Sequence, residues 1–141
     1  MLKRFSMAAI VFAFAAGMGF GQSNTHAGTP LSHTSPANGK QMFNNYCASC
    51  HGLDGKGNGP VAPTLKMPPT DLTALSKNNH GEFPEKHVIS VLQNGTTIPT
   101  HGTAEMPIWG PVLGGMDKPS PQVQKLRVSN LVRYLETLQA K

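Results

Sequence analysis

The stretch that decides the fold reads Cys47-Ala48-Ser49-Cys50-His51 and contains the only two cysteines of the 141-residue chain. Two cysteines in an oxidising compartment usually form one disulfide. This spacing, C-x-x-C-H, is instead the attachment signature of c-type haem, in which both thiols bond to the porphyrin and the adjacent histidine reaches the iron. The motif therefore predicts one covalently attached haem c, held by Cys47 and Cys50, with His51 as an iron ligand.

Two other kinds of site also use the C-x-x-C spacing. A zinc site needs about four ligands, whereas only two cysteines exist here and the remaining histidines are scattered along the chain. A thioredoxin-like redox site would lie in a βαβ pattern, and no strand pattern is present. The context favours haem, and a haem-free thiol oxidoreductase remains an alternative that would leave the cysteines free or disulfide-paired.

Apolar periodicity and capping residues predict an all-α domain with three main helices and long loops around the haem. The first is expected to start at Ser35-Pro36, with serine as cap and proline in the first turn, and to run to Cys50. The second is expected from Pro84-Glu85 to Gly95 and the third from Ser120-Pro121 onward. The predicted buried faces comprise Val88, Ile89 and Leu92 on the second helix, and Val123, Leu126, Leu131, Tyr134, Leu135 and Leu138 on the third.

Two irregular stretches connect these helices, and both are rich in glycine and proline. Residues 52–84 leave room only for a turn or two of helix at 71–76, and residues 96–119 are expected to be irregular. Loops this long are uncommon in a compact domain unless something else supplies the core that they surround. A buried haem would do so. The residues after Leu138 are expected to fray.

The second iron ligand must come from far along the chain, because His51 occupies one face of the haem. Met106 is favoured since it lies in a loop between the second and third helices and can fold over the opposite face. A thioether ligand raises the reduction potential. Most methionines serve in core packing, and Met67 and Met116 stay open as rivals. His101 is the histidine alternative and would lower the potential.

The N-terminus has the pattern of a secretory signal. Lys3 and Arg4 precede an apolar run over residues 5–21, and Thr25-His26-Ala27 offers small residues for cleavage. The run is short for a membrane span. We therefore expect residues 1–27 to be a signal peptide and the protein to be periplasmic and soluble, with an uncleaved anchor as the alternative.

The remaining chain is the size of one small domain. Residues 28–35 are polar and read as a flexible lead-in, and residues 36–141 form the folded domain. Loss of Lys3 and Arg4 leaves ten basic against seven acidic residues, a formal charge of +3 without a basic cluster. Nucleic-acid binding is therefore not predicted, whereas an acidic protein partner could be steered toward the surface.

Several motifs in this order resemble class I c-type cytochromes, the bacterial monohaem type, over about residues 36–140. Gly39-x-x-x-Phe43-x-x-x-Cys47-x-x-Cys50-His51 is similar to the family's N-terminal helix, and Leu131-x-x-Tyr134 to the pair on the last helix that packs across it. The resemblance implies a cytochrome c fold around one haem.

The same resemblance implies roles for two further residues. Gly59-Pro60 resembles the family's proline after the haem motif, so the Pro60 carbonyl is expected to accept a hydrogen bond from the His51 ring. Trp109 follows Met106 as in many bacterial members. The Trp109 side chain is expected either to donate a hydrogen bond to a haem propionate or only to pack against the haem pocket.

These features predict an electron carrier and not an enzyme. One exposed haem edge would dock briefly on a redox protein donor and then on an acceptor, through the small interfaces typical of such encounters. The same sequence would also serve a cytochrome subunit of a dehydrogenase or oxidase, and it leaves the oligomeric state open. The alternative from another class is a haem enzyme or gas-binding sensor whose sixth iron position is open or easily displaced.

Overall fold

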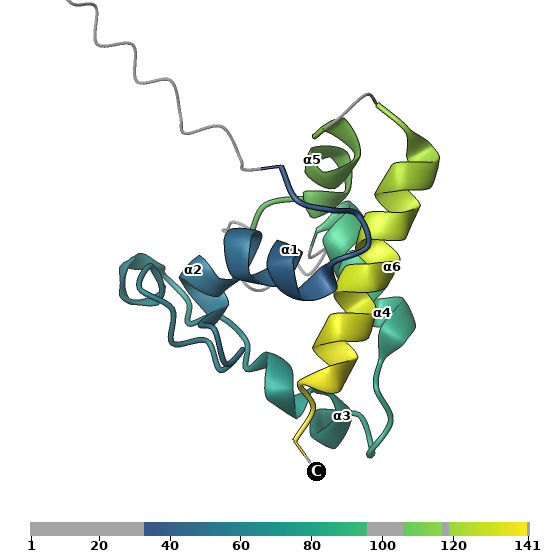
Figure 1. Ribbon diagram of the computed structural model, residues 1–141. Helices are drawn as coiled ribbons and strands as arrows, with labels where there is room; N and C mark the ends of the chain where they lie inside the picture. Colours follow the sequence, from purple (N-terminus) through teal and green to yellow (C-terminus); the bar gives the residue numbers. More distant parts are fainter. Residues whose placement is uncertain (1–32, 96–105, 117–118, 141) are drawn as a thin grey trace, which may run out of the picture.

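The computed structural model describes residues 33–95, 106–116 and 119–140 (Figure 1). The described residues contain no strand, in agreement with the predicted all-α class. The predicted signal peptide, most of the lead-in and His101 lie outside the described residues. The helical elements are α1 (Gly39–Tyr46), α2 (Ala48–His51), η1 (Ala62–Thr64), η2 (Leu72–Ala74), α3 (Leu75–Asn78), α4 (Glu85–Asn94), α5 (Trp109–Gly115) and α6 (Pro121–Thr137).

The first and last helices, α1 and α6, pack across each other (Figure 1), and Gly39 lies at their contact. A Cβ atom at Gly39 would clash with the backbone carbonyl of Asn130 and lie 2.9 Å from Cβ of Tyr134. The Phe43 and Tyr134 rings pack beside this contact, with centroids 5.4 Å apart and planes tilted by 52°. The missing side chain therefore lets the two backbones approach closely enough for the aromatic pair to form.

The start of α1 differs from the prediction. Asn38 caps the helix by accepting the Gln41 N–H at 2.9 Å, whereas Ser35 lies in the preceding turn and its carbonyl accepts the Asn38 N–H at 3.1 Å. The Pro36 carbonyl accepts the Asn130 side-chain amide of α6 at 3.0 Å. Because this tertiary contact keeps Pro36 outside α1, the N-cap residue is Asn38 and not Ser35.

The second predicted helix is confirmed in position. It is α4, which begins after Pro84 and ends at Gly95, whose φ of 76° stops the helix. Val88 and Leu92 are buried, and Ile89 is half-buried against the same core. The short turns η2 and α3 fall where a turn or two of helix was expected.

Helix α5 corrects the prediction of an irregular stretch over 96–119. Its sequence, WGPVLGG, contains three glycines and a proline, and so has little intrinsic tendency to be helical. Its glycines allow close approach to its neighbours. A Cβ at Gly110 would lie 3.0 Å from the Gln93 carbonyl of α4, and one at Gly114 would lie 2.9 Å from Gln124 Oε1 of α6.

The long helix α6 begins as predicted, with Ser120 accepting the Val123 N–H at 3.3 Å. Leu131 and Leu135 are buried as expected, but Leu126 is 48% exposed, so its placement on the buried face was wrong. The adjacent Arg127 is buried instead. The helix turns by about 100° per residue, which directs Arg127 inward and Leu126 outward.

Arg127 reaches a residue that the sequence had placed in the flexible lead-in. Its Nη1 donates to Thr34 Oγ1 at 3.0 Å, and Thr34 Oγ1 also bonds to the Tyr46 hydroxyl at 2.8 Å. Thr34 is buried. Ordered packing therefore begins before Pro36.

The hydrophobic core of the described residues comes from the helices. Burying each of its larger side chains contributes about 1.5–3 kcal/mol. No described helix is long and apolar enough to cross a membrane. The core side chains are Met42, Phe43, Tyr46, Ala48, Val88, Leu92, Leu113, Val128, Leu131, Val132 and Leu135.

Candidate functional site

The cysteine and histidine side chains of the motif are carried on a single helical turn. Cys47 ends α1 and also precedes α2, so the chain continues with little interruption into Ala48–His51. The Cys47 carbonyl accepts the N–H groups of Cys50 at 3.2 Å and His51 at 2.9 Å. Both thiols are half-buried and not joined in a disulfide. Hydrogen bonding therefore fixes the spacing of the two thiols and the imidazole.

The loop after the motif folds back onto this turn. Gly59 N–H donates to the Cys50 carbonyl at 3.0 Å, and Val61 N–H donates to the Ser49 carbonyl at 2.9 Å. A Cβ at Gly59 would clash with the Ser49 carbonyl and lie 2.6 Å from that of Ala48. Only glycine permits this contact, which holds the motif against its own loop.

The His51 ring contacts a backbone carbonyl, but not the one expected. Nδ1 lies 3.0 Å from the Thr70 carbonyl oxygen. The expectation that Pro60 supplies this carbonyl is therefore wrong: the Gly59-Pro60 bend lies along the backbone of α2, and the chain returns to the imidazole at Thr70. A carbonyl can only accept, so Nδ1 carries the proton and a neutral ring presents Nε2 as its ligand atom.

The environment of His51 also favours its neutral form. Burial lowers the pKa of the imidazole, and the hydrogen bond to Thr70 acts in the opposite direction. The net shift is downward from the ordinary value of 6.5. At neutral pH the ring is therefore uncharged, as a metal-binding imidazole must be.

Met106 and Trp109 lie on the segment that enters α5. Met106 is half-buried and packs against the same core as Cys47. Trp109, the first residue of α5, stacks on Tyr46 with ring centroids 5.9 Å apart and planes 28° from parallel. Tyr46 directly precedes Cys47, so this stack joins the Met106 segment to the motif.

The other candidate ligands fall in different places. Met67 is 47% exposed, whereas Met116 is half-buried against the core. His80 and His87 are exposed. No cluster of three or more histidine, cysteine or acidic side chains able to hold a metal ion occurs in the described part of the chain.

Comparison with known proteins gives the family. A family model described as Cytochrome c matches residues 36–139. The chain belongs to the cytochrome c family. Searches of the curated proteins and of the solved structures found no match. The chain is thus a haem-binding electron-transfer protein, and its family carries covalently attached haem c.

The donor set of this cytochrome c fits one such haem. Two unpaired thiols and an imidazole with Nε2 available lie on one turn, and the Met106 thioether packs against the same core as the first thiol. Bound haem supplies an iron that takes up and releases one electron. The residues that can hold it are Cys47 and Cys50 for the porphyrin and His51 and Met106 for the metal.

The Cys47 thiol does not resemble the reactive thiol of a disulfide oxidoreductase. Burial, and secondarily Cys50, raise the pKa of Cys47 to about 12. Reactive cysteines of redox enzymes have a lowered pKa, because the thiolate is the nucleophile. The neutral Cys47 thiol therefore disfavours the thiol-enzyme alternative.

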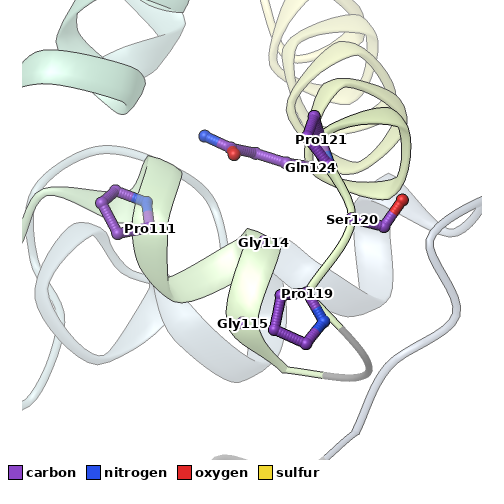
Figure 2. Close-up of a pocket in the computed structure, with 7 residues that line it drawn as sticks. All are labelled: Pro111, Gly114, Gly115, Pro119, Ser120, Pro121 and Gln124. Atoms are coloured by element: carbon purple, nitrogen blue, oxygen red, sulfur yellow. The ribbon is translucent and has the colours of Figure 1, made fainter.

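The cytochrome c also has a pocket apart from these groups, between α5 and the start of α6 (Figure 2). Its volume is about 270 Å³. None of its lining side chains is titratable or ligates metals, so we assign it no role. The lining residues are Pro111, Gly114, Gly115, Pro119, Ser120, Pro121 and Gln124.

Sequence reasoning missed two residues. One is Thr70, whose carbonyl contacts the His51 ring. The other is Gln139, which bonds to Leu72 and Ser76. Thr70 contributes a backbone oxygen, which every residue type possesses, so its identity carried no signal. Gln139 was placed in a fraying end because it follows the last apolar residue of the helical pattern, Leu138.

Proposed function

We propose that this cytochrome c is an exported monohaem carrier that moves single electrons between a redox protein donor and acceptor. In this proposal Cys47 and Cys50 hold the haem, and His51 and Met106 bind the iron. The observation that carries it is the 3.0 Å contact of His51 Nδ1 with the Thr70 carbonyl, which leaves Nε2 free to ligate.

The proposed ligand pair suits electron transfer more than catalysis. A methionine thioether is soft and neutral, favours ferrous iron and so raises the reduction potential. An iron with six ligands leaves no position for a substrate. The partly buried position of Met106, packed against the same core as Cys47, supports its selection over the exposed Met67.

Export and partner choice rest on the sequence. Residues 1–27 have the signal pattern, and the chain that follows carries a formal charge of +3. Mild positive charge favours encounter with acidic redox partners. The intact mass of the exported protein tests both cleavage after Ala27 and the presence of one attached haem.

The ligands are tested by visible and near-infrared absorption of the oxidised and reduced protein beside Met106→Ala. We expect a methionine-to-iron charge-transfer band in the oxidised wild type that is lost in Met106→Ala. Met116→Ala is the matched control, because Met116 is likewise half-buried against the core. It should keep the band.

Other spectra would point elsewhere. Loss of the band in Met116→Ala but not in Met106→Ala would make Met116 the ligand. If the wild type lacks the band, His101 becomes the candidate ligand, and His101→Ala should then change the spectrum. Rapid carbon monoxide binding to the reduced wild type would support the haem enzyme or gas sensor instead of the carrier.

A further inference from the structure

The C-terminal end of the chain is bonded to the segment that faces the haem histidine (Figure 1). Gln139 Nε2 donates to the Leu72 carbonyl at 2.7 Å and to the Leu135 carbonyl at 2.8 Å. Gln139 Oε1 accepts the Ser76 N–H at 2.8 Å. One side chain thus joins the end of α6 to both η2 and α3, and the predicted fraying after Leu138 is wrong at Gln139.

The backbone adds a third bond to the same segment. Ala140 N–H donates to the Thr73 carbonyl at 2.9 Å. Within this segment Asp71 Oδ1 accepts the Thr73 N–H at 2.8 Å and the Thr73 hydroxyl at 2.7 Å. Residues 71–76 are therefore stabilised by hydrogen bonds within the segment, from Asp71, and by hydrogen bonds from Gln139 and Ala140.

This segment is continuous with the carbonyl that contacts His51. Thr70 lies two residues before Leu72, whose carbonyl Gln139 binds and whose N–H donates to the Gly55 carbonyl at 2.7 Å. Leu72 is thus bonded on both sides, by the loop after the haem motif and by Gln139, which follows α6. Both attachments therefore lie two residues from the carbonyl that contacts Nδ1.

We propose that Gln139 is a positioning residue for His51, acting through Leu72 and the Thr70 carbonyl to set the strength of the Nδ1–H···O bond and hence the reduction potential. The inference rests on the proposed function in taking His51 as an iron ligand. A carbonyl that accepts the second ring proton fixes the ring orientation and raises the basicity of the ligand nitrogen. A more basic ligand favours ferric iron, so a weaker bond raises the potential.

The test compares the complete haem-loaded protein with Gln139→Ala. We expect the variant to have a higher midpoint potential, seen as about a threefold rise in the ferrous-to-ferric ratio at a fixed ambient potential. That ratio corresponds to about 28 mV, at about 59 mV per tenfold for one electron. Exchange of the His51 Nδ1 proton, followed by NMR in the reduced protein, should also be faster.

Thr137→Ala is the matched control. Its hydroxyl donates to the Tyr134 carbonyl at 2.6 Å, so it removes a side-chain hydrogen bond from the same helix end without touching residues 70–76. It should leave both the potential and the proton exchange at wild-type values. An equal shift in Thr137→Ala would mean that any weakening of the helix end moves the potential, and would overturn the role of Gln139.

Ala140→Pro provides a second test that keeps the Gln139 side chain. Proline has no N–H to donate to the Thr73 carbonyl, and it also restricts the backbone of the preceding Gln139. A shift of the same sign is expected. If the proteins keep a normal haem spectrum and neither Gln139→Ala nor Ala140→Pro changes potential or exchange, the inference is wrong while the proposed function stands. A spectrum without a histidine-bound haem in the wild type would instead defeat the proposed function itself.

Discussion

Gly39 marks the point where α1 and α6 approach most tightly, and it makes a sharp test of the crossing. A methyl group there would meet the Asn130 carbonyl and Tyr134 Cβ, and neither backbone can move without separating Phe43 from Tyr134. Gly39→Ala is expected to lower the free energy of unfolding by about 3 kcal/mol, the upper part of the range for overpacked cores. Thermal unfolding of the haem-loaded wild type and variant measures this loss of stability.

The control is Gly115→Ala in α5, where an added Cβ meets no heavy atom within 4 Å. This variant should be neutral or stabilise by up to about 1 kcal/mol, since alanine is the better helix former. Equal destabilisation by the two substitutions would mean that the crossing at Gly39 is looser than the structure has it.

At the scale of single residues, sequence patterns predict best where the interaction is local. The Ser120 cap and the Gly95 stop need only their own helix, and both are found where predicted. Ser35 and Asn38 are both good capping residues, and the choice between them is made by Asn130, 94 positions along from Pro36. Local rules could not identify that contact.

Helix α5 also could not be predicted from local sequence rules, here at the scale of a whole element. Its glycines and proline oppose helix formation, so its conformation depends on packing against α4 and α6, which the sequence does not display. The glycines that lowered its predicted helicity are the residues that permit this packing, because they allow its backbone close to Gln93 and Gln124.

Alanine at Gly110 or Gly114 tests whether the neighbouring atoms can move to make room for a methyl group. Gly110→Ala would place Cβ 3.0 Å from a backbone carbonyl of Gln93, which is fixed in α4, whereas Gly114→Ala would place Cβ 2.9 Å from the flexible Oε1 end of Gln124 and 3.2 Å from its Cβ. We expect Gly110→Ala to destabilise by about 1–2 kcal/mol and Gly114→Ala to change stability by less than about 0.5 kcal/mol, because better helix propensity offsets a small rearrangement. Chemical denaturation of both variants distinguishes them, and the reverse order would contradict the placement of α5.

At the scale of the molecule, the buried apolar side chains of the described residues belong to α1, α2, α4, α5 and α6, while residues 52–84 contribute none of them. Leu72, Leu75 and Phe83 only pack against that core from outside. The all-α class could be predicted from apolar periodicity and capping residues, and the long loop without a core of its own agreed with a buried haem. The route of that loop could not, since it is set by backbone bonds such as those of Gly59 and Leu72.

The same distribution predicts how the molecule responds when the haem is not attached. Cys47→Ala combined with Cys50→Ala removes both attachment points, and residues 52–84 then lack the haem that we expect them to surround. We expect a largely disordered chain with much lower helix content by circular dichroism than the haem-loaded wild type.

Ser49→Ala is the control for this double variant, because it alters an exposed side chain of the same turn and keeps both cysteines. It should attach haem and retain the wild-type spectrum. Native-like helix content in the double cysteine variant would refute the expectation and show that α1, α4, α5 and α6 form a stable core by themselves. Haem would then order only the loop that surrounds it.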